Sequence, residues 1–153
     1  GYGVRWAAYK KLCKRIGNDV IFEPSAYVIN PENLVLGNDF VLHEFCYFQC
    51  SGALVSIGNN CAIAHGVSIL TGKHNFEKYH KTSNLRCKGN TFAPIIIEDN
   101  VWVGCQSVIL GGVIVGNGAV IGANSLVNKT IPSLTVNVGT PAKTIKKISP
   151  KYI

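Results

Sequence analysis

A polar stretch near the middle of the chain, TGKHNFEKYHKTSNLRCKGNTFAP over residues 71–94, carries His74 and His80. Histidine titrates near pH ~6.5, so it can take a proton from a hydroxyl or an amine that attacks an activated carbonyl. A loop of this length between tight, regular segments is usually functional or disordered. His74, at the start of the stretch, is the first candidate for a general base, and His80 is its rival.

The other reactive side chains form no pattern typical of a zinc site or a disulfide framework. The six cysteines include no CxxC pair. Cys46 and Cys61 fall where equivalent positions carry Ala, Val or Ser, which favours small buried fillers in a reducing compartment. We expect His43 and His65, which lie within regular segments, to be structural or to face an acceptor.

Basic residues gather at both ends of the chain, which has a net charge of +7. Five cations precede the first acid, and no acid follows Asp99. Such clusters attract the phosphates of nucleic acids, lipids or nucleotide cofactors, although a solvated surface explains them equally well. The C-terminal cluster consists of Lys129, Lys143, Lys146, Lys147 and Lys151.

Length and composition indicate one domain that must cover its apolar faces. Of the 153 residues, 47% are hydrophobic and 15% are charged, so we expect stacking or association. No apolar run reaches the roughly 18 to 20 residues of a membrane span. The first residues show no secretory signal pattern, and we expect a cytoplasmic location.

A six-residue period runs through most of the sequence. Branched aliphatic residues recur at every sixth position over residues 103–127, with Gly and Asn between them. The pattern begins near Ile16 and resumes after the polar stretch, giving twelve units. A six-residue period does not keep one face of a helix aligned, which excludes a coiled coil.

Each hexad predicts a short strand followed by a turn. Gly and Asn tolerate turn conformations that branched residues resist. The aliphatic residue points inward, and each strand bonds to the next coil. One hexad buries little by itself, so stability comes from stacking the repeats.

This repeat resembles the hexapeptide-repeat acyltransferase family. TGKHNFEK and APIIIEDNVWVG resemble segments of sugar and polysaccharide O-acetyltransferases of the maltose and galactoside acetyltransferase type. The resemblance covers about residues 16–148 and implies an all-β fold, a left-handed parallel β-helix with three hexads per triangular coil. It implies that Ile97 stacks on Val115, Val103 on Ile121 and Ile109 on Val127.

This arrangement divides the chain into residues 1–15, a β-helix over residues 16–139 with a loop over residues 71–94, and residues 140–153. Trp6, Tyr9, Leu12 and Cys13 recur at helical spacing, which predicts a capping helix or a membrane-surface helix with weak association. In TPAKTIKKIS, Thr140 as N-cap with Pro141 after it predicts a short C-terminal helix.

The resemblance also implies an active site. His74 matches the catalytic histidine, and the backbone at two matched positions contacts the pantetheine arm of coenzyme A. Lysines near the end meet the phosphates, where Lys acts as a point charge. Trp102 either packs at a coil corner or contacts the ligand. The matched cofactor-binding positions are Trp102, Cys105, Ala123, Asn128, Lys129, Lys143 and Lys146.

The implied activity is acetyl-CoA-dependent O-acetylation of a sugar or polysaccharide-precursor hydroxyl, without a metal. The hydroxyl attacks the thioester directly, and a backbone N–H near Cys105 holds the oxyanion. Family members are homotrimers, so a homotrimer is expected. The family's acceptor-positioning Asn has no evident counterpart in HEFCYFQCSGA, so we expect a different acceptor pocket.

Three alternatives share the fold. An N-acetyltransferase acting on a nucleotide-linked amino sugar would use the same cofactor and base. A γ-type carbonic anhydrase needs three histidine ligands, which the spacing of His43, His65, His74 and His80 does not supply. A non-enzymatic β-helix could bind partners through its basic ends, but the lysines are not interleaved with aromatics as in nucleic-acid readers, so no nucleic acid is expected.

Overall fold

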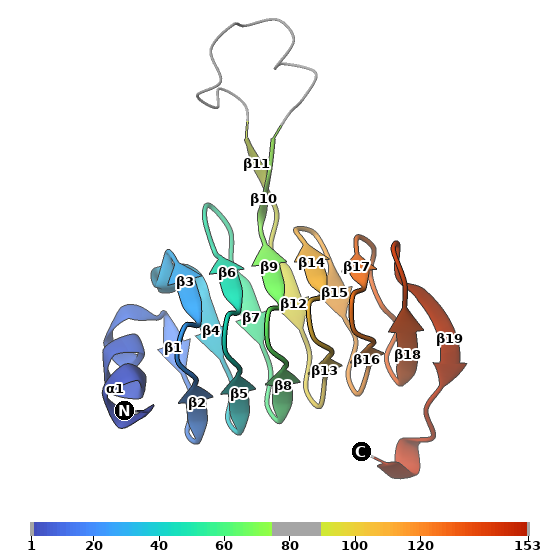
Figure 1. The fold of residues 1–153 in the computed structure, drawn as a ribbon, viewed down its shortest axis with the longest axis horizontal. Coiled ribbons are helices and arrows are strands. Elements are labelled where there is room, and N and C mark those ends of the chain that lie inside the picture. Colours follow the sequence, from blue (N-terminus) through green and yellow to red (C-terminus); the bar gives the residue numbers. More distant parts are fainter. Residues whose placement is uncertain (1, 75–89, 153) are drawn as a thin grey trace, which may run out of the picture.

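Short strands stack into three sheets that form the sides of a long prism (Figure 1). The computed structural model describes residues 2–74 and 90–152, and His80 lies outside the described residues. Three successive strands and their turns make one coil, and each strand hydrogen-bonds to strands of the neighbouring coils rather than to its neighbours in sequence.

We name the three sides faces A, B and C. Face A consists of β1 (Arg15–Ile16), β4 (Leu34–Leu36), β7 (Val55–Ile57), β12 (Ile95–Ile97) and β15 (Ile114–Val115). Face B consists of β2 (Val20–Phe22), β5 (Phe40–Leu42), β8 (Cys61–Ile63), β13 (Trp102–Val103), β16 (Val120–Ile121), β18 (Thr135–Val138) and β19 (Lys143–Lys147). Face C consists of β3 (Tyr27–Ile29), β6 (Tyr47–Gln49), β9 (Ser68–Leu70), β14 (Val108–Leu110) and β17 (Leu126–Val127).

The stacking register agrees with the six-residue period. Ile97 pairs with Val115, Val103 with Ile121 and Ile109 with Val127, all in parallel. These three predictions are confirmed. The register is strongly specified because a slip of one residue would turn every inward aliphatic side chain toward solvent.

The core is a column of apolar side chains along the prism axis. Its three phenylalanines lie in the first two coils, whereas the later coils are filled by Ile and Val. Burying such a side chain contributes roughly 1.5–3 kcal/mol relative to leaving it exposed. The fully buried phenylalanines are Phe22, Phe40 and Phe48.

Turns between faces bring backbones too close for side chains at some positions. A Cβ on Gly37 would lie 2.5 Å from the carbonyl carbon of Gly58 in the next coil. Asn60 and Asn100 adopt φ angles of 53° and 59°, a left-handed conformation that Asn tolerates. Phe45 takes the same conformation at φ 58°, which no hexad pattern predicts.

Helix α1 (Tyr2–Leu12) covers the first coil of the prism (Figure 1). Trp6, Tyr9 and Cys13 pack against the core, and the Tyr9 ring stacks on Phe22 with centroids 4.4 Å apart. The side of α1 that carries these residues therefore serves as a cap, although Leu12 is exposed. Within residues 2–74 and 90–152, no helix is long and apolar enough to cross a membrane.

The expected C-terminal helix is wrong. Residues 143–147 form β19, which pairs antiparallel with β18, and a 3₁₀ turn, η2 (Pro150–Tyr152), follows. β18 is the last parallel strand of face B, so its outer edge would be left without hydrogen-bond partners. Pairing that edge outweighs the local helix signals of Thr140 and Pro141, and the lysines of β19 discourage any further strand from adding.

Candidate active site

His74 stands at the outer end of a two-stranded stem that leaves the prism between faces C and A (Figure 1). The strands β10 (Gly72–Lys73) and β11 (Thr91–Phe92) pair antiparallel, with Gly72 opposite Phe92 and Lys73 opposite Thr91. His74 directly follows β10 and is exposed. The stem therefore projects the candidate base away from the coil.

The stem is fixed to the prism by an aromatic contact with two glycines. A Cβ on Gly72 would lie 2.9 Å from Cε1 of Phe92, and a Cβ on Gly52 would lie 2.6 Å from its Cγ. The ring of Phe92 therefore lies directly on the backbone of both glycines. At the foot of the stem, the buried Thr71 hydroxyl lies 2.9 Å from the Gln49 carbonyl oxygen and 2.7 Å from that of Ser51.

A pocket of about 200 Å³ opens at the foot of the stem. It lies between the stem and the neighbouring coils, and its walls include Lys73, Thr91, Gly111 and Asn128. Of the predicted cofactor-binding residues, Asn128 is thus brought to the stem that carries His74. Lys129 follows it and is exposed.

A second group of predicted residues lies at the corner between faces B and C. Cys105 and Ala123 occupy equivalent positions in consecutive coils, and Asn124 N donates to the Cys105 carbonyl at 2.9 Å. The N–H groups of Gly104 and Gln106 bond to the coils on either side. Among the inter-coil hydrogen bonds of the described residues, the intervening Cys105 N–H takes no part, which leaves it available to a ligand.

Two histidines line the same corner. His65 Nδ1 lies 3.5 Å from Cys105 Sγ, and His43 Nδ1 lies 3.0 Å from Glu23 Oε2. Sequence reasoning missed the contact between His65 and Cys105, although a signal was present. Ile63 and Val103 share a repeat position in adjacent coils, so the residues two places later must also be neighbours.

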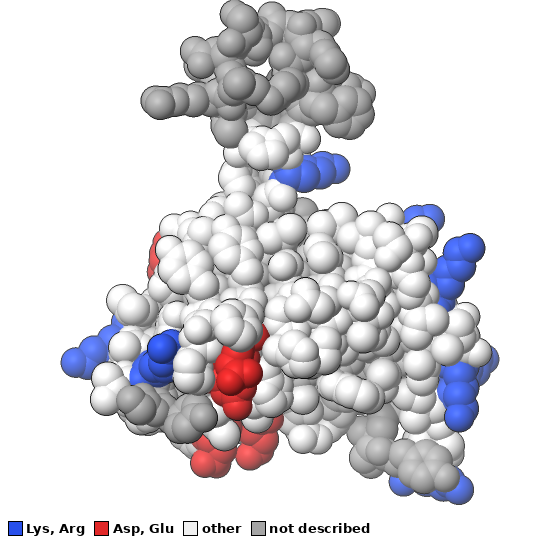
Figure 2. Space-filling model, viewed as in Figure 1, with Lys and Arg blue, Asp and Glu red and all other residues white. Residues whose placement is uncertain are grey.

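Trp102 lies on the outer side of face B and is 56% exposed. It therefore does not pack in the core of this chain, and its indole is open to a ligand or another protein surface. Lys143 and Lys146 are exposed on β19. Figure 2 shows lysine and arginine side chains at both ends of the prism, acidic side chains toward the α1 end, and a largely uncharged surface over the rest of the prism in this view.

The two groups of candidate residues do not meet within one chain. β9 runs from the corner beside His65 to the foot of the stem, so face C separates Cys105 from His74. Three strand residues span about 10 Å at ~3.3 Å per residue. A single chain therefore presents His74 and Asn128 at one edge of face C, and Cys105 and Ala123 at the other.

The described cysteines are free thiols, and most of them are structural. Burial raises the pKa of the Cys46 and Cys61 thiols to about 11 and that of Cys50 to about 12, because the thiolate cannot be solvated there. The prediction that Cys46 and Cys61 are small buried fillers is confirmed. Cys105 is half-buried at its corner.

The same architecture occurs in proteins of known structure. Residues 94–129 match the bacterial transferase hexapeptide (six repeats) family. The galactoside O-acetyltransferase of Escherichia coli (strain K12) is 33% identical over 146 residues, which cover 95% of this chain and 69% of the relative. A galactoside acetyltransferase in complex with coenzyme A has a TM-score of 0.85 at 31% identity, covering 96% of this chain and 71% of that chain.

A hexapeptide-repeat-containing acetyltransferase from Vibrio cholerae O1 biovar eltor, complexed with acetyl coenzyme A, is also similar. It has a TM-score of 0.87 at 25% identity, covering 97% of this chain and 79% of that chain. This chain belongs to the hexapeptide-repeat acetyltransferase family, and its prism is a left-handed parallel β-helix. It spans about half of the length of one relative, from Schizosaccharomyces pombe, to which it is 38% identical.

Proposed function

We propose that the protein transfers an acetyl group from acetyl-CoA to a hydroxyl of a sugar or polysaccharide precursor, with His74 as general base. The observation that carries this proposal is the position of His74 on a stem that stands beside a pocket at the edge of the repeat wall. The similarity to a galactoside O-acetyltransferase supports the sugar hydroxyl as acceptor.

The chemistry requires one proton transfer in each direction. The imidazole of His74 takes the hydroxyl proton as the oxygen attacks the thioester carbonyl, and a tetrahedral oxyanion forms. When that intermediate collapses, the carbon–sulfur bond breaks, and the imidazolium returns the proton to the leaving thiolate. The products are the acetyl ester and free coenzyme A, and no covalent enzyme intermediate is needed.

The corner of Cys105 supplies the oxyanion contact in this proposal. Its backbone N–H is held by the flanking inter-coil hydrogen bonds of Gly104 and Gln106, so it needs little reorganisation. Losing one such donor typically costs ~10²–10³ in kcat. Ala123 offers the equivalent backbone one coil further along the pantetheine arm. Trp102, Asn128, Lys129, Lys143 and Lys146 complete the proposed coenzyme A site.

We further propose that the site is shared between subunits of a homotrimer. His74 and Cys105 lie on opposite edges of face C in one chain, so neither half is sufficient by itself. Packing the stem of one subunit along the Cys105 corner of another brings the halves together. We place the protein in the cytoplasm, because its described cysteines are all free thiols.

The test is steady-state release of free thiol from acetyl-CoA by the purified protein with a panel of sugar and amino-sugar acceptors. We expect acceptor-dependent release that falls by about 10²–10⁴-fold in His74→Ala, the range of general-base contributions. Lys14→Ala, an exposed residue outside both groups of candidate residues, is the control. Full activity in His74→Ala would move the base to His80 or elsewhere, and the absence of both thiol release and calorimetric coenzyme A binding would refute the proposal.

A further inference from the structure

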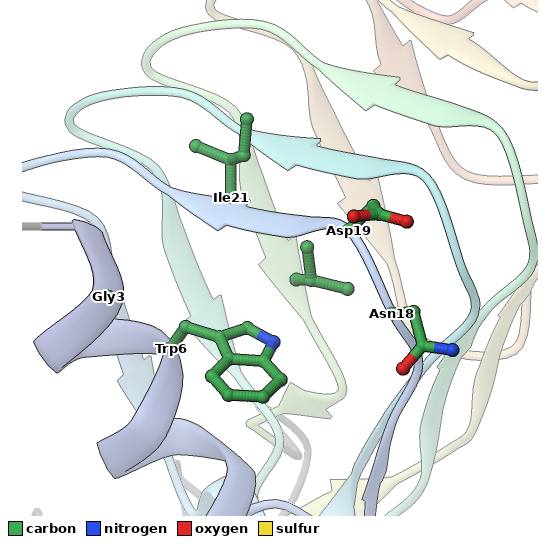
Figure 3. A pocket seen from close by; sticks show the side chains of 6 residues that line it. Gly3, Trp6, Asn18, Asp19 and Ile21 are labelled. Carbon is green, nitrogen blue, oxygen red and sulfur yellow. The ribbon is translucent and has the colours of Figure 1, made fainter.

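A second hollow lies at the opposite end of the prism from β19, between helix α1 and the first coil. Its volume is about 670 Å³, and its described walls are Gly3 and Trp6 of α1 with Asn18, Asp19, Val20 and Ile21 of the first coil. Figure 3 shows the Trp6 ring extending from α1 toward β2 and the turn that carries Asn18 and Asp19. None of these residues belongs to the proposed acetyl-transfer site.

The apolar part of this groove exists because α1 does not cover β2 completely. Tyr9 stacks on Phe22, whereas Trp6, one turn earlier, is half-buried and leaves Ile21 43% exposed. Gly3 adds no side chain, and a Cβ there would meet nothing within 4 Å. An indole and an isoleucine therefore form an apolar surface that water still reaches.

The polar part of the groove is the unfinished end of a hydrogen-bonded column. At the corner between faces A and B, the backbone N of Asn18 donates to Asn38 Oδ1, that of Asn38 to Asn59 Oδ1, and that of Asn59 to Asp99 Oδ1, at 2.6–2.9 Å. Each side chain thus receives the N–H of the preceding coil. Asn18 belongs to the first coil, so its carboxamide has no preceding coil to serve.

The Asp19 side chain also has unused hydrogen-bonding capacity. Its backbone carbonyl accepts from Phe40 N at 3.2 Å, but among the described residues no hydrogen bond or ion pair engages its exposed carboxylate. Its φ of 53° fixes the turn from which the side chain projects. A carboxylate and a carboxamide with unused hydrogen-bonding capacity therefore flank the indole.

We propose that this groove is a binding site for a neutral sugar unit of an oligosaccharide. The flat apolar face of a pyranose ring fits an aromatic surface, while its hydroxyl groups donate to a carboxylate and exchange hydrogen bonds with a carboxamide. Ligand sites typically combine such an apolar wall with a few polar groups, in volumes of about 300–1,000 Å³. The choice of a saccharide rests on the proposed sugar acceptor.

Among the described lining residues of the groove, the single charged side chain is Asp19, which disfavours an anionic ligand. Asp19 would repel a phosphate or carboxylate, and the Lys10 ammonium is already placed over the Trp6 ring, 4.3 Å from its centroid. That cation–π contact also holds the indole in its orientation. A bound sugar would therefore meet a fixed aromatic surface.

The position of the groove indicates an acceptor longer than one sugar. The stem of His74 leaves the prism after the third coil, two coils beyond β2, or about 10 Å at ~4.8 Å per coil along the axis. The groove would hold a unit of the acceptor chain remote from the hydroxyl that reacts. It would thereby raise the affinity for oligosaccharides without changing the reaction of a monosaccharide.

The experiment uses the intrinsic fluorescence of Trp6. The chain has two tryptophans, so a Trp102→Phe variant leaves Trp6 as the single reporter. The protein is first screened on an array of neutral oligosaccharides of glucose, galactose, mannose and N-acetylglucosamine, and the strongest binder is titrated in solution. We expect a saturable change in Trp6 fluorescence. Because Trp6→Ala lacks this reporter, its affinity is measured by isothermal titration calorimetry beside wild type, and we expect at least about tenfold weaker binding, since aromatic anchors dominate such sites.

A second variant guards against a folding defect in Trp6→Ala. Asp19→Asn changes an exposed side chain, should leave the melting temperature unaltered, and should also weaken binding. His74→Ala should bind the oligosaccharide as wild type does. Array binding by no oligosaccharide, or affinity unchanged in both Trp6→Ala and Asp19→Asn, would overturn the proposal.

The two proposals fail separately. Groove variants should raise the KM for the oligosaccharide while leaving acetyl transfer to a monosaccharide unchanged. If the wild type releases no thiol with any acceptor but Trp6 fluorescence still reports oligosaccharide binding, the acetyl-transfer proposal is refuted and the binding-site proposal is supported. If thiol release depends on His74 but no groove variant affects oligosaccharide binding or KM, only the binding-site proposal is refuted.

Discussion

The stacked coils and the stem that leaves them differ in how their strands pair and in how far their side chains are buried. In the coils, strands of two to four residues bond in parallel to strands of neighbouring coils, and each inward side chain is almost wholly buried. In the stem, two strands bond antiparallel to each other, and Lys73, Thr91 and Phe92 are all exposed to some degree. The coils are stabilised by repeated contacts with their neighbours, whereas the stem depends on one antiparallel pair of strands, the Thr71 hydrogen bonds and the contact of Phe92 with two glycines.

Because of this difference, we expect the coils to determine the stability of the fold and the stem to affect the proposed reaction. A side chain inside the prism supports its neighbours above and below, so its loss weakens the whole stack. A side chain on the stem supports little except the position of His74. Substitutions in the coils should therefore change the free energy of unfolding, and substitutions at the stem should change turnover.

The largest effect on this comparison is expected from Phe48→Ala in the core. Phe48 is fully buried on face C, and such truncations cost about 3–5 kcal/mol because they leave a cavity. Urea unfolding followed by circular dichroism measures the loss. Tyr47→Ala, one residue away but pointing outward at 36% exposure, is the control and should cost far less. Equal losses in the two variants would contradict the inward–outward assignment.

The next effect should come from Gly72→Ala at the foot of the stem. The new Cβ would lie 2.9 Å from Cε1 of Phe92, so the ring and the stem must shift. A displacement of about 1 Å near a reacting group can cost ~10²-fold, and we expect kcat to fall by up to that amount with little change in the unfolding midpoint. Turnover with saturating acetyl-CoA measures it.

A second substitution tests whether the cause is the aromatic contact. Phe92→Leu removes the ring atoms that the new methyl group meets, so Gly72→Ala with Phe92→Leu should recover part of the lost kcat. If the double variant is no better than Gly72→Ala, the Phe92 contact does not position His74.

A smaller effect should appear in the pH dependence of stability. The pKa of Cys61 is raised from 9.0 to about 11 by burial, so the folded state holds a proton that the unfolded state has lost between these values. Stability is therefore complete below pH ~9 and falls as the pH rises toward 11, by up to ~1.4 kcal/mol per pH unit for this thiol. Urea unfolding at several pH values should show the decline.

Cys61→Ala is the matched variant, since Ala119 occupies the same column two coils later. It should flatten the decline between pH 9 and 11 relative to wild type. An unchanged slope would mean that the buried thiol does not link protonation to folding.

The smallest effect on turnover is expected from Cys105→Ala. The proposed contribution of this residue is its backbone N–H, which the substitution keeps, so most of the kcat should remain. Iodoacetamide should nevertheless inactivate the wild type by placing a bulky group at the corner, and acetyl-CoA should protect it. A Cys105→Ala enzyme without activity would instead indicate a role for the thiol.

Much of the fold could be predicted from the sequence because each hexad by itself indicates a short strand and a turn. The inward aliphatic residue and the turn that follows are local features. Together with the three hexads per coil that the resemblance to the family implied, they predicted the pairing of Ile97 with Val115. His74 could be placed after the last regular strand for the same reason. The candidate residues near the break in the period could therefore be named from the sequence.

The C-terminal end of the prism and the attachment of the stem were not predictable in the same way. Thr140 and Pro141 are typical of a helix start, but residues 143–147 form a strand instead, because this strand pairs with the otherwise unpaired edge of β18. The contact of Phe92 with Gly52 and Gly72 joins residues that no period relates. The repeat by itself thus determined the short strands, their turns and the inward aliphatic positions, because this information is local and is repeated many times. Only the tertiary structure decided the capping strand, the seat of the stem and the groove beside Trp6, because each arises where repetition stops and distant segments meet once.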